Sequence, residues 1–235
     1  YGPAGRAWGW VAQHLRATDA SGRIVGILPL YLRFNSHGDF IQDWSWASAY
    51  QQLGRVYYPK LLSGVPHTPA AGRRLLVGDG PDAAMIRQAL IDGAQAVASE
   101  YQASSWHVAF PDTELKLLLQ YAELLISHKV QFHWLNNGCG DFDGYLATFA
   151  AEKRRKVRAE RRRVSESGLS IEIRHGDEVD PAEWPALHAL YASTFEKFNN
   201  YAVMSVACFA ELAQTLDRRM VVFIARDGRD PVAVS

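Results

Sequence analysis

The chain has 235 residues, of which 48% are hydrophobic and 21% are charged, and its 25 basic and 25 acidic residues leave no formal net charge. This composition excludes a disordered or fibrous chain, and the length suffices to bury the core of one large domain or of two modest ones. The longest apolar runs are far shorter than the ~20 residues of a membrane helix, and the two cysteines lack a pairing or metal-ligand pattern, so we predict a reduced, cytoplasmic setting.

Strands and helices alternate in the first part of the chain. The residue patterns predict strands at residues 22–33, 40–44, 56–65, 104–110 and 130–136, and helices at residues 44–54, 81–100 and 112–128. Asp112 is placed as the N-cap of the third helix. A turn cluster at residues 136–141 predicts a domain boundary after residue 137. Residues 1–137 are therefore expected to form one mixed α/β domain.

Residues 138–235 are predicted to form a second α/β domain. A long helical stretch over residues 142–165 opens it, with one apolar side that packs, and Gly168 follows as a residue suited to a left-handed cap. The later patterns predict a strand at residues 169–175, helices at 181–198 and 206–217, and a hairpin at 220–234. Because the last strand has no further partner and the first residue is not Met, we expect a longer polypeptide in which this domain is truncated here.

One segment, residues 151–164, carries eight basic and two acidic residues, which leaves 17 basic and 23 acidic residues in the rest of the chain. On a helix, cations at three-to-four spacing share one broad side and form a surface for an anion. The residues concerned are Lys153, Arg154, Arg158, Arg161 and Arg162. Nucleic acid, a coenzyme phosphate and a lipid-linked pyrophosphate would all fit. The alternative is a solvated helix face that binds nothing.

A second anion site is predicted in the loop before residue 81, where Arg73 and Arg74 follow Gly72. A strand, a glycine-containing loop and a helix can place backbone N–H groups and positive charge around a phosphate. The segment carries no Walker or dinucleotide fingerprint. The alternative is a connecting loop.

Aromatic residues gather near a carboxylate and a lysine in residues 43–60. Rings can line a substrate cleft, although core packing is the alternative. The members of this group are Asp43, Trp44, Trp46, Tyr57, Tyr58 and Lys60. We take Asp43, Tyr58 and His67, a histidine in a polar loop, as candidates for acid–base catalysis. The eight histidines show no metal-ligand spacing, so no metal site is predicted.

Several segments occur in the order in which they occur in a known family: "LPLYLR", "DWSWASAY", "YYPKLLSGVPHTPAAGRRLL", "FHWLNNG", "DFDGYLATFAAEKRRKVRAER" and "MVVFIARDGRDPVAVS". Over essentially its whole length the chain resembles the Fem-like proteins, a bacterial peptidoglycan biosynthesis/recognition group within the GNAT (acyl-CoA N-acyltransferase) superfamily. Arg154, Arg158 and Gly168 match the Lys/Arg-rich helix that opens the second domain of aminoacyl-transferring Fem enzymes. Cys139 and His67 depart from the family pattern, which has aromatic residues there.

The resemblance implies tandem GNAT-like domains, residues 1–137 and 138–235, of which the second is incomplete. It implies N-acyl transfer to an amine of a small molecule or peptidoglycan precursor. The donor would be an acyl-CoA or an aminoacyl-tRNA, bound as a substrate and not as a covalent cofactor. The loop before residue 81 would hold the donor pyrophosphate in the first domain, and the matching loop of the second domain would follow residue 235. No DNA partner and no transmembrane segment are implied.

Two functions of other classes stay open. One is a non-catalytic recognition module that binds a cell-wall precursor or another polyanion. The other is a sequence-tolerant RNA-binding protein, which is less favoured because the aromatic residues are not interleaved with the basic segment.

Overall fold

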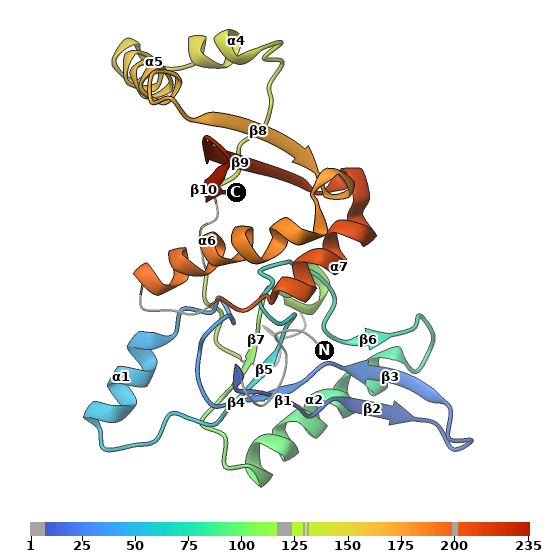
Figure 1. The fold of residues 1–235 in the computed structure, drawn as a ribbon. Helices are drawn as coiled ribbons and strands as arrows, with labels where there is room; N and C mark the ends of the chain where they lie inside the picture. Colours follow the sequence, from blue (N-terminus) through green and yellow to red (C-terminus); the bar gives the residue numbers. More distant parts are fainter. Residues whose placement is uncertain (1–7, 117–123, 129, 131, 199–201) are drawn as a thin grey trace. The chain divides into compact units, whose positions relative to one another are not determined.

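The computed structural model describes residues 8–116, 124–128, 130, 132–198 and 202–235. The chain divides into two compact units, Tyr1–Ser127 and His128–Ser235 (Figure 1). Both combine helices with β-sheet, so the mixed α/β class is confirmed, while the tandem GNAT-like identity of the domains and the truncation stay predictions. Among the described residues, no helix is both long enough and apolar enough to cross a bilayer.

The first unit contains two small sheets. One has the strand order β1–β4–β5–β7, where the strands are Trp10–Ala12, Tyr31–Arg33, Lys60–Ser63 and Trp106–Val108. The other has the order β2–β3–β6, formed by Leu15–Thr18, Ile24–Leu28 and Leu76–Val77. Only β5 and β7 pair in parallel among these strands.

Helix α2, Ala83–Glu100, supplies much of the core of this unit, and Figure 1 shows it alongside β2 and β3. Gly26 on β3 lets the helix approach, because a Cβ there would lie 2.7 Å from Ile86 Cγ2. Leucines from β3, β4 and β5 meet α2 in one apolar cluster, which comprises Leu28, Leu30, Leu32, Leu61, Leu75, Val77, Ala83, Leu90, Ile91, Ala94 and Leu115.

Two predicted strands of the first unit are wrong in detail. The predicted strand 22–33 is divided between β3 and β4, which belong to different sheets, and Pro29 in the break has no N–H for a ladder. Residues 40–43 form no strand, and Phe40 and Gln42 adopt φ values of +58° and +56°. The helices predicted at 44–54 and 81–100 are confirmed as α1, Trp44–Gln52, and α2.

The predictions around residues 112–136 are met only in part. Residues 113–116 are helical, and Asp112 Oδ1 accepts a 2.9 Å hydrogen bond from the Leu115 N–H, as an N-cap does. Residues 117–123 of the predicted helix lie outside the described residues. Residues 132–136 form no strand, which contradicts the prediction for that segment.

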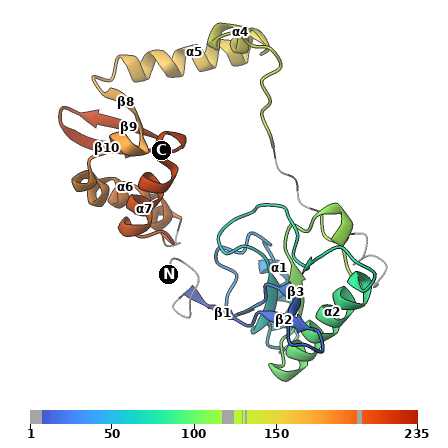
Figure 2. The ribbon, with the colours of Figure 1, turned by 90° about the vertical axis from the view of Figure 1, so that its right-hand side faces the viewer.

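The second unit is built on one antiparallel sheet with the order β10–β9–β8, formed by Asp230–Val234, Val221–Asp227 and Ser170–His175. Helices α6, Trp184–Lys197, and α7, Val206–Leu216, lie on one face of it (Figure 2). Alternate β9 side chains point into the core between them, which comprises Val179, Trp184, Leu187, Ala213, Val222 and Ile224. The predicted strand, helices and hairpin of this part are confirmed.

The predicted helix over residues 142–165 is two helices, α4, Phe142–Ala147, and α5, Ala151–Ser165. At the break, the Thr148 hydroxyl donates a 2.7 Å hydrogen bond to the Tyr145 carbonyl. Gly168 has a φ of +78°, as expected after the helix end. The packing side predicted for the stretch is wrong for α5, which buries no residue and leaves Val164 exposed.

Candidate functional site

One face of the four-stranded sheet carries charged side chains. Arg33 on β4 lies opposite Lys60 on β5, and Leu62 on β5 lies opposite His107 on β7. Side chains alternate along a strand, so Lys60, Leu62 and His107 face away from the core that Leu61 enters. Buried charges and polar groups need partners, and these partners define the site.

Lys60 is completely buried and binds two carboxylates. Its ammonium donates hydrogen bonds of 2.7 Å to Ser36 Oγ and 2.7 Å to Asp39 Oδ2, and a short one to Asp43 Oδ2. The side chains of both aspartates are almost fully enclosed. These bonds use all three ammonium hydrogens, so Lys60 has none to offer a phosphate, which corrects its predicted anion-binding role.

Asp43 is the residue through which the cluster extends. Its Oδ2 also accepts a 2.6 Å hydrogen bond from the Tyr57 hydroxyl. Burial alone would raise the pKa of this carboxyl, but hydrogen bonds from Lys60, Tyr57 and Ser36 outweigh burial and lower the pKa to about 2. Asp43 is therefore ionised at neutral pH. Its other oxygen, Oδ1, is buried without a hydrogen-bond partner among the described residues.

His107 lies at the accessible end of the cluster, with 24% of its side chain exposed. Its Nε2 is 3.2 Å from the Tyr57 hydroxyl, 2.9 Å from Ser105 Oγ and 3.9 Å from Asp43 Oδ2. Burial and the charge of Lys60 lower the pKa of His107 from its usual 6.5. The imidazole is therefore mainly neutral at pH 7.

Two hydroxyl oxygens face Nε2 of His107. Tyr57 gives its only hydroxyl proton to Asp43, so its oxygen faces Nε2 as an acceptor, while Ser105 Oγ, 2.9 Å away, can donate to Nε2 or accept from it. A proton on Nε2 satisfies both oxygens, and we take this tautomer as the one to test. Nδ1 then carries the lone pair. In the part of the chain that the structure describes, Nδ1 has no hydrogen-bond partner, and this nitrogen is not fully buried. The arrangement can accept a proton at Nδ1.

The two tyrosines of the cluster keep their protons. Burial and the neighbouring Asp43 raise the pKa of Tyr57 far above 10, and burial raises the pKa of Tyr58. The Tyr58 hydroxyl lies 2.8 Å from Ser36 Oγ. A base needs an empty acceptor position at working pH, so the predicted catalytic candidate Tyr58 fits the role of a hydrogen-bonding neighbour better than that of a base.

The structure brings together four predicted residues, Asp43, Tyr57, Tyr58 and Lys60, but not Trp44. Trp44 opens α1 and is half exposed, and its ring lies 5.2 Å from that of His37. His67 has a φ of +55°, donates its backbone N–H to the Gly38 carbonyl at 3.1 Å and packs its ring 5.4 Å from that of Trp10. These contacts place His67 beside β1 and the turn at Gly38.

Arg73 and Arg74 have different environments although they are adjacent. Arg74 is buried and donates to the carbonyls of Ala109 at 2.9 Å and Ala70 at 2.5 Å, with longer bonds to those of Phe110 and Arg73. It holds the loop to the end of β7, which corrects its predicted role at a phosphate. Arg73 is exposed and has no ion pair or hydrogen bond from its side chain within the described residues.

The basic segment forms α5, and three of its predicted arginines contact α4 or the loop after it. Arg158 lies 3.6 Å from Asp143, the Arg161 guanidinium lies 4.1 Å from the centre of the Phe142 ring, and Arg154 donates to the Phe149 carbonyl at 3.1 Å. These three predicted residues are therefore partly occupied by contacts with α4 and the loop after it.

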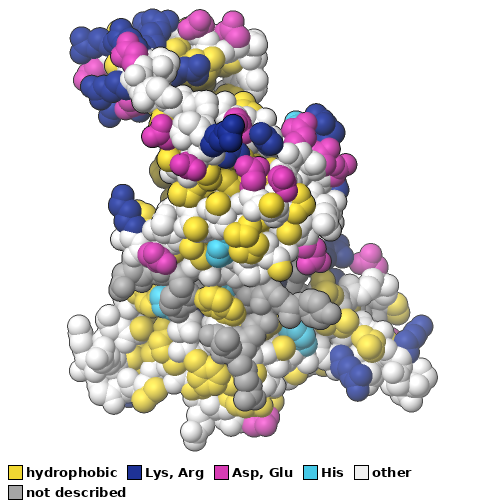
Figure 3. Space-filling view, viewed as in Figure 1, with side chains coloured by type: hydrophobic (Ala, Val, Ile, Leu, Met, Phe, Trp, Pro, Cys, Tyr) yellow, Lys and Arg dark blue, Asp and Glu magenta, His cyan; other side chains and the backbone are white. Residues whose placement is uncertain are grey.

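The remaining cations of α5 stay available. Within the described ranges, four side chains have no ion pair or hydrogen bond: Lys153, Arg155, Arg162 and Arg163. Figure 3 shows Lys and Arg side chains gathered over α5, with acidic side chains among them. Exposed guanidinium groups without partners suit phosphate. The predicted anion surface thus shifts toward Arg155 and Arg163, which the sequence analysis did not select.

Sequence reasoning missed Ser36, Asp39, Ser105 and His107. A signal was present for His107, because it lies within "SSWHVAF", a segment that predicts a buried strand. A titratable residue in such a strand must find polar partners. Asp39 and Ser36 gave no comparable signal.

In the described ranges, no group of three or more His, Cys, Asp or Glu side chains is placed to hold a metal ion. The model of a family described as peptidoglycan biosynthesis/recognition, FemAB-like, matches residues 1–235. This match confirms the resemblance read from the sequence. The search of curated proteins finds no match.

Proposed function

This chain belongs to the FemAB-like family, whose description is peptidoglycan biosynthesis/recognition, and we propose that it transfers an acyl or aminoacyl group to an amine of a peptidoglycan precursor. The family match supports the role in peptidoglycan biosynthesis. The chemistry of the Asp43–Tyr57–His107 cluster supports the transfer reaction.

Such a transfer needs a proton acceptor. The amine nitrogen attacks the donor carbonyl, a C–N bond forms, and the ester bond of an aminoacyl-tRNA or the thioester bond of an acyl-CoA breaks. The nitrogen loses a proton, and the leaving oxygen or sulfur gains one. A positioned base with a pKa near or below the working pH can carry this proton.

His107 is the group that meets these requirements, and its position carries the proposal. Its lowered pKa keeps it neutral at pH 7, and Nδ1 is the nitrogen without a partner among the described residues. Ionised Asp43 fixes the Tyr57 hydroxyl, and that oxygen holds Nε2 at 3.2 Å. Buried Lys60 fixes Asp43 in turn. Tyr57 thus orients His107, as a further group orients the base in other covalent and acyl-transfer sites.

The cations of α5 supply a surface for the donor. Coenzyme A and tRNA both carry phosphates, and Arg155, Arg162 and Arg163 have exposed guanidinium groups without partners among the described residues. A tRNA donor would give steeply salt-dependent binding, because each neutralised phosphate releases counterions. A small coenzyme would give a shallower dependence.

The test is a transfer assay with the full-length protein, an amine-bearing muropeptide precursor, and either labelled aminoacyl-tRNA or labelled acyl-CoA. Product is measured by mass spectrometry. His107→Gln should lower kcat by about a hundredfold or more. His128→Gln, which changes an exposed histidine, is the matched control and should leave the rate unchanged.

The outcomes separate the functions. An undiminished rate in His107→Gln would remove His107 from the reaction. Binding of the precursor without product from any donor would replace the transferase by the recognition module.

A further inference from the structure

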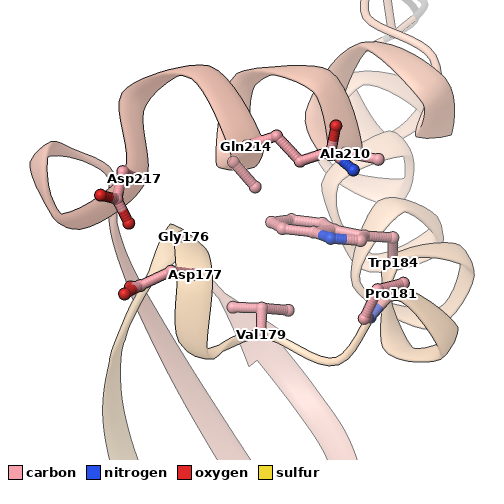
Figure 4. A pocket seen from close by; sticks show the side chains of 9 residues that line it. Gly176, Asp177, Val179, Pro181, Trp184, Ala210, Gln214 and Asp217 are labelled. Carbon is pink, nitrogen blue, oxygen red and sulfur yellow. The ribbon is translucent and has the colours of Figure 1, made fainter.

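We propose that the second unit contains a binding site for a primary ammonium group with a carbonyl oxygen a few atoms away. The site is a cavity of about 280 Å³ between the turn of residues 176–181, the start of α6 and the end of α7 (Figure 4). The lining residues that carry the inference are Asp177, Val179, Trp184, Ala210, Ala213 and Asp217.

Trp184 supplies an unused hydrogen-bond donor. Only 4% of this residue is exposed, and its ring stacks on Phe209 with centroids 5.9 Å apart. Among the described residues its indole N–H has no hydrogen-bond partner, yet the indole nitrogen is not fully buried. Figure 4 shows this nitrogen on the ring edge that faces Val179 and Pro181, which line the cavity. Buried tryptophans usually find an acceptor for this N–H, so the cavity is suited to one.

Two carboxylates lie at the same end of the cavity, those of Asp177 and Asp217 (Figure 4). Neither side chain forms an ion pair or hydrogen bond within the described ranges. The neighbouring cations are engaged elsewhere, since Arg218 pairs with Glu178 at 3.4 Å and Arg219 donates to the carbonyls of Thr215 and Leu216. A pair of uncompensated carboxylates attracts a cation.

Small residues create and fix the space between these groups. Ala210 and Ala213 form the α7 wall, where larger side chains would fill the cavity. Gly176 holds α7 close to the turn, because a Cβ at this position would lie 2.8 Å from the Ala213 carbonyl oxygen. The cavity is therefore set by backbone packing and does not depend on a flexible loop.

These groups together define the ligand chemistry. The ammonium binds Asp177 and Asp217, an apolar stem lies against Val179 and the Trp184 ring, and a carbonyl accepts the Trp184 N–H. The volume lies just below the usual range of about 300–1,000 Å³ for ligand sites, which suits a fragment of one or two amino-acid residues. A short amine-bearing peptide has these features. The site itself is independent of the transfer reaction. The identification of its ligand as the amine-bearing peptide of the acceptor rests on the proposed function.

Binding is tested by NMR titration of the 235-residue chain with Nα-acetyl-L-lysine methylamide. Shifts are expected in the Trp184 indole resonance and in α7. Asp217→Asn and Asp177→Asn, which keep the size and shape of each side chain and remove its charge, should each weaken binding about tenfold. Glu211→Gln, on the exposed side of the same helix, is the matched control and should bind as the wild type does.

Two analogues test the two parts of the ligand. Acetylation of the probe's side-chain amine should abolish binding, and n-butylamine, which lacks the carbonyl, should bind about tenfold more weakly. Equal binding of all three compounds, or binding unaffected by both Asn variants, overturns the proposal. Displacement of the probe by millimolar Ca²⁺ also overturns it in favour of a cation site.

Trp184→Phe removes the N–H and keeps an aromatic ring. It should weaken the probe but leave n-butylamine binding unchanged. If this variant does not fold, the two Asn variants and the two analogues still test whether the site binds the ammonium and the carbonyl group. The titration needs no donor and no turnover, so His107→Gln should bind the probe normally, and failure of the transfer reaction is distinguishable from failure of this site.

Discussion

The Tyr57 hydroxyl donates a 2.6 Å hydrogen bond to the buried carboxylate of Asp43. The same carboxylate oxygen accepts a hydrogen bond from the Lys60 ammonium. Asp43 Oδ2 therefore joins the buried ion pair with Lys60 to the hydroxyl that contacts Nε2 of His107.

The charges of this cluster should respond non-additively to substitution. Lys60→Met should lower the free energy of unfolding by about 3–5 kcal/mol, because it leaves two buried carboxylates without a cation. Adding Asp43→Asn to Lys60→Met should recover part of this loss, whereas Asp43→Asn alone should destabilise the protein. Urea denaturation of the four proteins gives the values.

The Asp19–Arg23 pair provides the control for this cycle, because 79% of the Arg23 side chain is exposed. Arg23→Gln should leave the urea midpoint nearly unchanged. If Asp43→Asn costs the same with and without Lys60, the two side chains are not coupled as described.

Two adjacent arginines should behave oppositely. Arg74→Ala should lower the free energy of unfolding by about 3 kcal/mol, since it leaves the buried carbonyl of Ala109 and its neighbours without a donor. Arg73→Ala should change it by less than about 0.5 kcal/mol, because that side chain is exposed. Thermal or urea unfolding of both variants makes the comparison. Similar losses of unfolding free energy in the two variants would contradict the role of Arg74 in holding the loop to the end of β7.

Local patterns predicted most elements but not their partners. α2, α7 and the β9–β10 hairpin follow from periodicity and turn residues, which are local signals. The break between β3 and β4 was missed because apolar residues continue through Pro29, and only tertiary structure assigns the two halves to different sheets.

The candidate site was only half predictable for the same reason. Asp43, Tyr57, Tyr58 and Lys60 are close in sequence and were grouped, yet Lys60 was given the wrong kind of partner. Its second carboxylate, Asp39, is 21 residues away in an irregular loop. His107 joins from β7, whose parallel pairing with β5 is a long-range interaction that no local pattern encodes.

The available cations of α5 should determine polyanion binding. Arg155→Ala and Arg163→Ala should each weaken tRNA binding and reduce the slope of log affinity against log salt by about 1 for every phosphate that no longer meets a guanidinium group. Their stability should not change, because neither side chain has a partner within the described residues. Arg229→Ala, an exposed arginine in the β9–β10 turn, is the control. No measurable tRNA affinity at low salt would leave acyl-CoA as the donor.

Acid should destabilise the protein in two steps. The pKa of His107 is lower in the folded state than 6.5, so its contribution is full above pH 6.5 and declines as the pH falls through that value. The pKa of Asp43 is about 2 in the folded state against 3.8, so about 2 kcal/mol is lost between pH 3.8 and pH 2. The free energy of unfolding, measured against pH, should show both steps, and His107→Gln should lack the upper one. A wild-type curve that is flat between pH 7 and pH 5 would contradict the burial of a neutral His107.

The most direct test of a neutral, Nε2-protonated His107 is an NMR titration of its ring with ¹⁵N-labelled histidine. We expect a titration midpoint below 6.5 and Nδ1 as the unprotonated nitrogen at pH 7, with the midpoint moved in Tyr57→Phe. A midpoint at or above 6.5, or a proton on Nδ1 at neutral pH, would contradict the assignment of His107 as the proton acceptor.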